Sequence, residues 1–338
     1  MMESTLLKLL DGGQAVDEMT SELCDFTIEQ QNSFAESQGI KTTASSDFQP
    51  ILGKTVSYIV ACVIFNENNE ILMMQEAKKS CAGKWYLPAG RIESGEKIVE
   101  AAQREVYEET GLNIRVTTLL AVESASGSWF RFVVTGDVLN GELKTPSRAD
   151  KESLQAKWLK NLDEVILRSN DILNIIEIGR NYYNQPKDST WHRSILPSLK
   201  AHSKNYLRVV IAVRKRASPH RVNVLISDCI KNHFPIVEIH PSKSLHSTLR
   251  KFMVELFGAE VGQHRPVGLL SIEHDPSSST SNVTDGICLT LLVVFKPTLE
   301  EISLIGKCSW FELSKDVSDR LSLIVVSKNS TFPLNVVR

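Results

Sequence analysis

Apolar positions along the first half of the chain follow two periods, one typical of strands and one typical of helices. Runs rich in β-branched and aromatic residues, bounded by polar turns, predict strands at 56–65, 71–75, 116–124, 128–138 and around Trp158. Helical periods are expected over 96–110 and 171–183. Strands that surround one crossover helix and are closed by a second helix indicate the α/β class, as an α/β/α sandwich.

The helix predicted over 96–110 has an apolar stripe along one side. Ile98, Ala102 and Val106 repeat every four residues, and Gly111 is a suitable C-cap at the end of the run. The acidic residues of the helix lie off this stripe.

Three glutamates of this helix, Glu105, Glu108 and Glu109, stand at i, i+3 and i+4, so their carboxylates share one face. Like charges this close raise each other's pKa values unless a cation neutralises them. Magnesium takes oxygen ligands and binds through carboxylates and substrate phosphates. The spacing therefore predicts a magnesium site that acts on a phosphorylated substrate, a solvated acidic face being the alternative.

The residues before the helix suit the same chemistry. Gly90 and Gly95 lie in the loop that leads into the helix, where backbone N–H groups can face a phosphate. Arg104 and Glu96 are expected to form an ion pair that fixes this loop and orients Glu105.

Written as letters, the run reads GRIESGE at 90–96 and REVYEETGL at 104–112. It matches every fixed position of the signature box of the Nudix hydrolases, so the chain resembles that family. The resemblance implies the Nudix fold and magnesium-dependent hydrolysis of a diphosphate bond, for which Mn²⁺ can substitute. The metal ligands that it implies are the Gly90 carbonyl, Glu105, Glu108 and Glu109.

Stretches outside the box resemble a narrower group of the family, the animal 8-oxo-dGDP phosphatases of the MutT-homologue type. They lie at 71–78, 85–90, 129–133, 143–145, 171–173 and 285–289. This resemblance implies hydrolysis of oxidised purine nucleoside diphosphates, 8-oxo-dGDP and 8-oxo-GDP, to the monophosphate and phosphate. Such a reaction keeps damaged nucleotides out of nucleic-acid synthesis.

The same resemblance assigns catalytic roles to individual residues. Glu105, Glu108 and Arg104 belong to the catalytic centre. Glu152, six residues before Trp158, is either an additional acidic ligand or a solvated loop charge. The general base is Glu108 or Glu152, and the sequence does not choose between them.

Substrate contacts are expected on three elements. By resemblance, Leu72 lines the nucleoside pocket, and Arg91 is a further substrate-binding residue. Asp171 either pairs with the Watson–Crick edge of the purine, donating as well if it retains its proton, or is an ordinary N-cap. Trp85 and Phe130 are expected in the core, with base stacking as the alternative.

The second half contains a related pattern without the acidic residues. Shifted by 147 residues without a gap, Glu108 and Gly111 fall on Glu255 and Gly258, whereas Gly90, Glu96, Arg104, Glu105 and Glu109 fall on Val237, Lys243, Lys251, Phe252 and Leu256. One remaining carboxylate cannot hold magnesium as three do. We interpret this half as an internal repeat, a degenerate Nudix-like α/β domain, the alternative being an unrelated α/β domain.

Four segments follow from these patterns. We expect a mobile N-terminal tail over 1–52, a catalytic domain over 53–186, a linker over 187–204 and the degenerate domain over 205–338.

Composition narrows the location and the partners. The net charge of −2 gives no sign of bulk binding to a nucleic-acid polymer or an acidic membrane. No apolar run approaches the roughly 20 residues of a membrane span, and the N-terminus shows no secretory leader. The six scattered cysteines are typical of reduced thiols, so we expect a cytoplasmic protein. The eight histidines, all beyond residue 190, are expected to be structural or on the surface.

The expected partner is a small-molecule nucleotide, and both a homodimer and an intramolecular contact with the degenerate domain stay open. Within the enzyme class, the alternatives are hydrolysis of ADP-ribose, another ADP-sugar or an RNA cap. The lack of an extended basic, aromatic-rich groove argues against the cap. The alternative from another class is a nucleotide-sensing or partner-binding module in the degenerate half.

Overall fold

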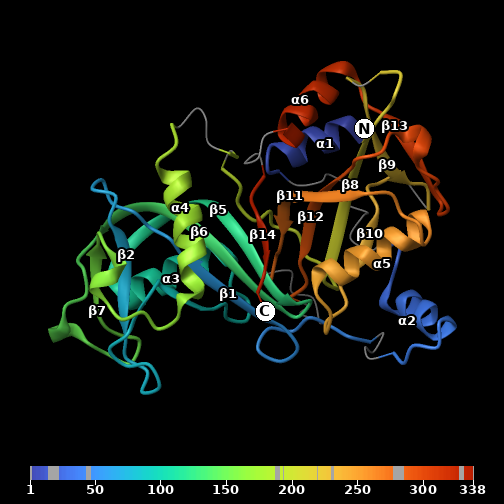
Figure 1. Ribbon diagram of the computed structural model, residues 1–338. Helices are drawn as coiled ribbons and strands as arrows, with labels where there is room; N and C mark the ends of the chain where they lie inside the picture. Colours follow the sequence, from blue (N-terminus) through green and yellow to red (C-terminus); the bar gives the residue numbers. More distant parts are fainter. Residues whose placement is uncertain are drawn as a thin grey trace. The chain divides into compact units, whose positions relative to one another are not determined.

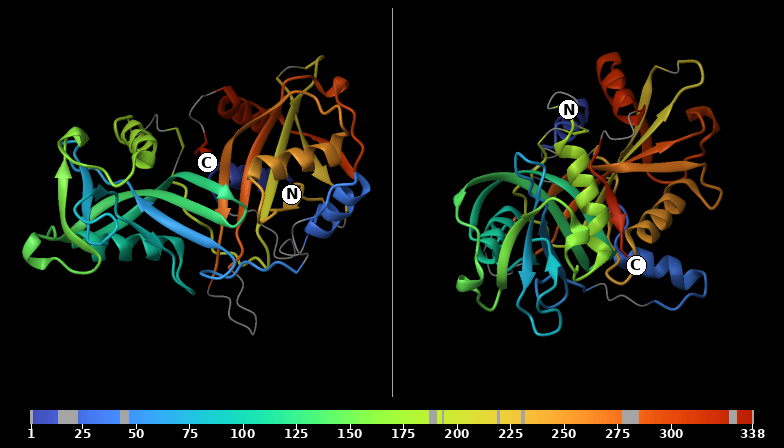
Figure 2. Two further views of the ribbon diagram at one scale, coloured as in Figure 1. Left: turned by 60° about the horizontal axis from the view of Figure 1, so that its bottom comes forward. Right: turned by 60° about the vertical axis from the view of Figure 1, so that its left-hand side comes forward.

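The computed structural model describes residues 2–13, 23–42, 47–186, 191–192, 194–218, 220–229, 232–276, 285–326 and 331–337 (Figures 1 and 2). They form two compact units, which we name for their place in the sequence. The central unit comprises Ser57–Glu123 and Phe130–Leu196, and the terminal unit comprises Met1–Val56, Ser124–Trp129 and Pro197–Arg338.

The central unit carries the predicted strands and helices in the expected order. Its strands are β1 Ser57–Cys62, β2 Ile71–Glu76, β3 Trp85–Tyr86, β4 Ala89–Arg91, β5 Leu112–Ser126, β6 Trp129–Gly141 and β7 Ser153–Leu159. Its helices are α3 Ile98–Thr110 and α4 Leu173–Tyr183, with 3-10 turns at Pro146–Arg148, Leu162–Glu164 and Asn170–Ile172.

The strands of the central unit form two sheets. One sheet has the order β5-β6-β1-β4, and the other has the order β3-β2-β7. β1 and β4 are antiparallel, with Val60 opposite Gly90. This pairing brings the loop that precedes α3 onto the sheet.

Two neighbouring residues of β1 show that the helices cover opposite faces. The thiol of Cys62 donates to the carbonyl oxygen of Ala102 in α3 (3.6 Å). Ala61 instead packs in the cluster that contains Ile175 and Ile176 of α4. Successive strand residues point to opposite faces, so α3 and α4 lie on either side of the sheet, as Figure 1 shows. The predicted α/β/α sandwich is confirmed.

The start of α3 differs from the prediction, whereas its stripe and its end do not. Ile98, Ala102 and Val106 are buried, and Gly111 ends the helix with a φ of 80°. The helix begins at Ile98 rather than at residue 96, because the Glu96 side chain bonds to the loop instead of continuing the helix.

The terminal unit contains helices from both ends of the chain. Its helices are α1 Met2–Leu10, α2 Ile28–Ser37, α5 Leu245–Phe257 and α6 Lys315–Val326. Its strands are β8 Tyr206–Arg214, β9 Val222–Ser227, β10 Ile236–Glu238, β11 His264–Glu273, β12 Cys288–Phe295, β13 Cys308–Glu312 and β14 Leu334–Val336, with a 3-10 turn at Leu299–Glu301.

One sheet, of order β11-β12-β8-β9-β13, forms the centre of the terminal unit, and β10 pairs with β8. Leu6 of α1 and Leu321 of α6 pack with Leu292 of β12 on one face. Leu291, the preceding residue of β12, lines a pocket with Leu249 of α5. Adjacent strand residues face opposite sides, so α5 covers the other face (Figure 2).

Two expected segments are corrected. The prediction of a mobile tail over 1–52 is wrong for the described residues of that range. Helices α1 and α2 lie there, and both Leu6 and Leu9 are fully buried. Part of the linker predicted over 187–204 is also wrong: Ile195 donates to Thr118 Oγ1 (2.9 Å) and accepts from Leu119 (2.8 Å). Residues 187–190 and 193 lie outside the described residues.

Among the described helices, none has both the length and the apolar character needed to cross a membrane.

Candidate functional site

α3 presents the predicted glutamates to the loop that precedes it. Glu105 and Glu109 are 8% and 3% exposed, whereas the side chain of Glu108 is 42% exposed. Because the buried stripe of α3 faces the sheet, the turn that carries Glu105 and Glu109 is held against β4. These carboxylates are therefore fixed in place, and Glu108 faces solvent.

The backbone of β4 fits closely around the buried carboxylates. A Cβ atom added to Gly90 would lie 1.9 Å from Oε1 of Glu105. The neighbouring Ala89 N–H donates to Oε2 of Glu109 at 2.9 Å. Glycine is required at position 90 because any side chain would displace the Glu105 carboxylate.

Arg104 links the loop to the helix, as predicted. Its guanidinium bonds both oxygens of Glu96, at 2.7 and 2.9 Å. It also donates to the Arg91 carbonyl oxygen (3.0 Å) and, through Nη1, to Glu105 (2.9 Å) and Glu108 (3.1 Å). The predicted Arg104–Glu96 ion pair is confirmed, and the same side chain orients Glu105.

Electrostatics distinguish the buried glutamates from Glu96. Burial raises the pKa of Glu109 well above its ordinary value, and the Glu105 charge adds to this effect. Burial also raises the pKa of Glu105 and outweighs the lowering effect of Arg104, while the charges of Glu108 and Glu152 add smaller increases. Burial of Glu96 acts in the same direction, but the Arg104 hydrogen bonds lower its pKa overall. Burial thus disfavours the charged forms of Glu105 and Glu109, and a bound cation would favour their ionisation.

The donor set fits a hard divalent cation. Carboxylate oxygens on one helix face are the ligands that Mg²⁺ prefers, and two of them are buried with raised pKa values. The described residues contain one group of three His, Cys, Asp or Glu side chains whose ligand atoms all lie within 4.8 Å of one another. That group lies in the terminal unit and not on α3. Glu105 and Glu108 converge instead on one nitrogen of Arg104.

The loop around Glu152 is tied to the C-terminal turn of α3. Asp150 accepts from the Glu152 N–H (2.9 Å) and from the Lys144 ammonium (2.9 Å), which also donates to the Glu108 carbonyl oxygen (2.6 Å). Ser153 Oγ donates to the Glu109 carbonyl oxygen (2.7 Å). Glu152 is close enough for its charge to raise the pKa of Glu105.

Asp171 belongs to a network that the sequence did not indicate. Its Oδ2 accepts from Tyr86 Oη (2.9 Å) and from Arg131 Nη1 (2.7 Å). Arg131 is 5% exposed and also pairs with buried Glu123. Arg168 stacks over the Tyr86 ring, with Cζ 4.6 Å from the ring centroid. The apolar pattern of β6 gave no sign of Arg131's partners.

Two expectations for Asp171 are corrected. It is not an N-cap: Ser169 caps the 3-10 turn, and Ile172 stands at the N-cap of α4. Burial alone would raise the pKa of Asp171, but hydrogen bonds from Arg131, Ser169 and Tyr86 lower it. The group is therefore a carboxylate in the folded protein and does not retain a proton with which to donate.

The remaining predicted contacts differ in exposure. Arg91 is exposed on β4, beside Gly90. Leu72 is fully buried in β2, so a nucleoside could reach it only if neighbouring side chains moved, and its predicted contact stays a prediction. Trp85 and Phe130 are buried, as expected for core residues.

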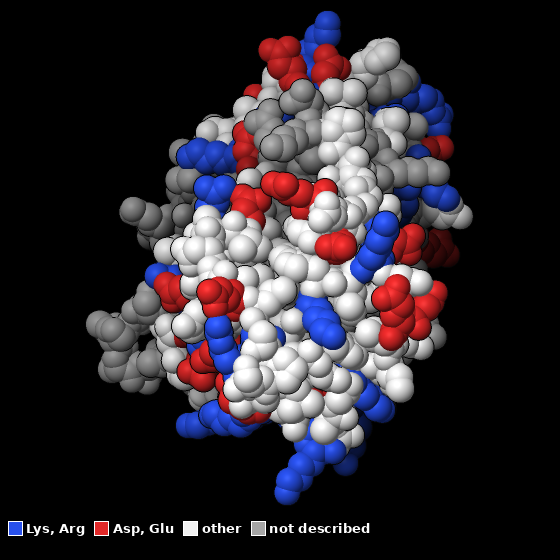
Figure 3. Space-filling model, turned by 90° about the vertical axis from the view of Figure 1, so that its left-hand side faces the viewer, with Lys and Arg blue, Asp and Glu red and all other residues white. Residues whose placement is uncertain are grey.

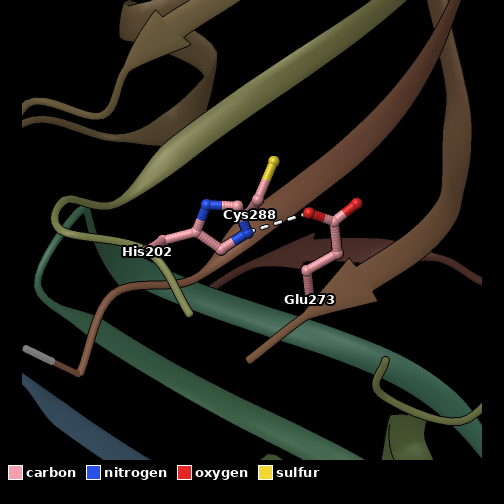
Figure 4. Close-up of side chains that lie close together, drawn as sticks. All are labelled: His202, Glu273 and Cys288. Atoms are coloured by element: carbon pink, nitrogen blue, oxygen red, sulfur yellow. Dashed lines mark hydrogen bonds and ion pairs between the residues drawn. The ribbon is translucent and has the colours of Figure 1, made fainter. Parts of the chain in front are cut away.

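The cluster of three possible metal ligands in the terminal unit consists of His202, Glu273 and Cys288 (Figure 4). Their ligand atoms all lie within 4.8 Å of one another. His202 Nε2 lies 2.8 Å from Glu273, and Arg208 bonds both oxygens of Glu273 at 2.7 and 3.3 Å. Burial raises the pKa of Cys288 to about 12. The guanidinium already neutralises the carboxylate and the thiol stays protonated, so the group is a buried ion pair and we assign no metal to it.

Comparison with known proteins gives matches over most of the chain. A family model described as the NUDIX domain matches residues 57–174. The chain is 36% identical to the 8-oxo-dGDP phosphatase NUDT18 of Danio rerio, over 74% of this chain and 76% of that protein. It is 34% identical to the protein of the same name in Mus musculus, over 84% and 88%, and 38% identical to that of Homo sapiens, over 72% and 73%.

Proposed function

Because this chain belongs to the Nudix hydrolase family, we propose that its central unit hydrolyses oxidised purine nucleoside diphosphates, 8-oxo-dGDP and 8-oxo-GDP. The products are the nucleoside monophosphate and phosphate. One observation carries the proposal: the buried carboxylates of Glu105 and Glu109 are packed against the backbone of β4 at Gly90. The relatives named 8-oxo-dGDP phosphatase support the substrate class.

Hydrolases of this family generally need a divalent cation, and we assign Mg²⁺, with Mn²⁺ as a substitute. Glu105, Glu108, Glu109 and the carbonyl of Gly90 would hold it. When bound, such a cation polarises a phosphoryl oxygen and lowers the pKa of a water molecule.

The residues of the chain have two further tasks. Arg104 keeps the loop and Glu105 in a fixed relation, so the site is organised before substrate arrives. A carboxylate must also take a proton from the attacking water. Glu108 and Glu152 are the candidates, because both are partly exposed while their charges act on Glu105.

Asp171 supplies the purine contact in this proposal. Both of its hydrogen bonds to Arg131 and Tyr86 reach Oδ2. An ionised carboxylate is only an acceptor, and the Watson–Crick edge of guanine presents the N1–H and N2–H₂ donors. Asp171 would therefore favour guanine over adenine nucleotides. It reads an edge that oxidation at C8 leaves unchanged, so it does not by itself distinguish 8-oxo-dGDP from dGDP.

We place this reaction in the cytoplasm, with a small-molecule nucleotide as the partner. Of the described side chains on the face in Figure 3, Lys and Arg are interspersed with Asp and Glu and form no continuous basic track. This charge distribution suits a mononucleotide better than capped RNA. A homodimer stays a prediction.

The test is release of phosphate and nucleoside monophosphate from 8-oxo-dGDP, 8-oxo-dGTP, dGDP and ADP-ribose with Mg²⁺. We expect 8-oxo-dGDP to be the best substrate and Glu108→Gln to lose most, but not all, of its turnover. Glu100→Gln, at an exposed glutamate in the first turn of the same helix, is the matched control and should remain active. Faster hydrolysis of ADP-ribose would keep the enzyme class and overturn the substrate.

The general base requires a separate comparison. Glu108→Gln and Glu152→Gln should be compared by their pH–rate profiles, because only loss of the base removes the limb that reports its ionisation.

A further inference from the structure

The terminal unit repeats part of the central unit at a spacing of 147 residues. α3 Ile98–Thr110 and α5 Leu245–Phe257 each have 13 residues and begin 147 positions apart. In the central unit Val60 is opposite Gly90, and in the terminal unit Leu207 is opposite Val237. Both strand pairs are antiparallel. Leu207 lies 147 positions after Val60, and Val237 lies 147 positions after Gly90.

Single backbone hydrogen bonds follow the same shift. Cys62 donates to Pro88 (2.9 Å), and Val209 donates to Pro235 (2.8 Å). The C-cap bonds agree as well, since the N–H groups of Gly111 and Gly258 each donate to the residue four positions earlier. Agreement of register, helix length and cap supports a common Nudix fold over an unrelated α/β domain.

The two buried carboxylates of the metal position are absent from the terminal unit, and Glu255 alone keeps the place of Glu108. Phe252 and Leu256 stand where Glu105 and Glu109 stand in the central unit, and both are buried. Lys251 takes the place of Arg104, and Lys243 takes the place of Glu96, so the ion pair of the central unit is replaced by two like charges. Burial and the Lys243 charge lower the pKa of Lys251.

A segment near the N-terminus covers this position. Phe26 forms a parallel bridge with Val237, and its ring stacks on that of Phe252, with centroids 6.1 Å apart and planes at 14°. Its carbonyl oxygen accepts from the Glu238 N–H at 3.1 Å. The Phe26 side chain therefore packs on the residue that replaces Glu105.

Asp25 replaces the lost carboxylate of Glu109. In the central unit the Ala89 N–H donates to Glu109 Oε2 at 2.9 Å. The equivalent N–H in the terminal unit, that of Ile236, donates to Asp25 Oδ2 at 2.7 Å. His233 Nε2 lies 3.1 Å from the same oxygen of Asp25. The same backbone donor thus keeps a carboxylate partner, supplied from a distant part of the chain.

α2 holds the segment in place. Its first residue, Ile28, is fully buried and donates to Glu238 Oε2 at 2.9 Å. Gln31, 2% exposed, donates to the Glu238 carbonyl oxygen at 2.8 Å. Both bonds end on the residue that corresponds to Arg91.

We propose that the terminal unit is a degenerate Nudix fold whose former metal site is filled by residues 25–31 of the same chain. The occupant supplies a carboxylate for the backbone donor and a ring for the space once used by metal-binding carboxylates. This unit therefore does not take a nucleotide at that site, which argues against the nucleotide-sensing alternative. Its N-terminal segment is a structural part of the fold.

The test uses the full chain and hydrogen–deuterium exchange. In Asp25→Ala and Phe26→Leu we expect the amides of Ile236 and Glu238 to exchange about tenfold faster or more, because local opening becomes easier. Glu29→Ala, at an exposed position of α2, is the control and should leave them unchanged. Phe26→Leu keeps the backbone bridge and most of the apolar volume, so it remains informative if Asp25→Ala unfolds the unit. Unchanged exchange in both variants would overturn the proposal.

Binding stoichiometry provides the second arm. Full-length Glu108→Gln, titrated with 8-oxo-dGDP and Mg²⁺ by calorimetry, should bind one nucleotide per chain. A second site that is lost on Phe252→Ala would overturn the proposal. No binding at all would contradict the substrate of the central unit, while the exchange experiment would still decide whether the segment fills the terminal site.

Discussion

A Cβ atom on Gly90 would lie 1.9 Å from Oε1 of Glu105, and the next two nearest atoms, at 2.1 and 2.4 Å, belong to the same carboxylate. The backbone of β4 and this carboxylate are thus in direct contact. Gly90 does not have a positive φ, so its requirement comes from this contact and not from backbone strain.

Gly90→Ala should therefore reduce kcat by roughly 100-fold, the scale expected when a catalytic group is displaced by about 1 Å. The measurement is steady-state hydrolysis of 8-oxo-dGDP, with circular dichroism to show that the fold is kept. Gly306→Ala, where the nearest atom to the new Cβ would be at 3.5 Å, is the control. Full activity of Gly90→Ala would mean that Glu105 can move away without consequence.

Arg104→Lys should raise the Mg²⁺ concentration needed for half-maximal activity by about 10- to 100-fold, as for loss of a residue that orients metal ligands. A lysine cannot reproduce the two-point bond to Glu96 together with the bonds to Glu105 and Glu108. Titration of activity with Mg²⁺ measures the effect. Arg115→Lys, in an exposed pair with Asp137, should leave the titration curve in place.

Asp171→Asn should raise KM for 8-oxo-dGDP by about 10-fold or more and change kcat little, because a charged hydrogen-bond acceptor contributes about 1.5–3 kcal/mol. An amide presents one acceptor and one donor where the carboxylate accepts twice. Hydrolysis of ADP-ribose, if measurable, should not respond. The matched control is Glu164→Gln, at an exposed acid in the preceding turn. A fall in kcat with an unchanged KM would remove Asp171 from base recognition.

Leu6→Ala should destabilise the terminal unit by about 2–5 kcal/mol, the usual cost of truncating a buried leucine. Leu6 is fully buried in the cluster formed by α1, α6 and the sheet. Denaturant unfolding measures the change in the free energy of unfolding. Ser4→Ala, on the exposed side of the same helix, should have little effect. Equal stability of the two variants would show that α1 does not contribute to this core.

Acid should destabilise the terminal unit between about pH 6.5 and pH 4 through His274. Burial lowers the pKa of His274 to about 4, so the unfolded chain binds a proton in this window that the folded protein does not. Stability therefore rises with pH through the window and falls as pH is lowered, with a slope of up to about 1.4 kcal/mol per pH unit for this group. His274→Gln should reduce that slope. Exchange protection of β11 and β12 at pH 7 and pH 5 measures it, and identical slopes would exclude His274.

Helix α3 was predictable because the residues that define it are close together in the sequence. Glu105, Glu108 and Glu109 lie within five consecutive positions, so the helical period alone places them on one face. The Arg104–Glu96 ion pair was predictable for the same reason, because the two residues are close in sequence. The apolar stripe and Gly111 defined the buried side and the end of the helix.

The parts that the sequence did not reveal depend on distant residues. Arg131 and Asp171 are 40 positions apart, and the apolar run around Arg131 predicted only a covered strand. Residues 1–52 have few aromatics and no sustained period, so nothing local showed that Asp25 and Phe26 pair with β10. The repeat was visible because the strand pair and the helix around the box keep one spacing of 147 residues.

The partnership of Asp25 with Ile236 has a consequence for the order of folding. These residues are 211 positions apart, so Asp25 leaves the ribosome long before its partner is synthesised. The central unit can be complete while the N-terminal segment still lacks its strand, and contacts of such long range form slowly. During synthesis the apolar side chains of α1 and α2 are therefore exposed to solvent before their packing partners exist. In this interval a chaperone can bind them.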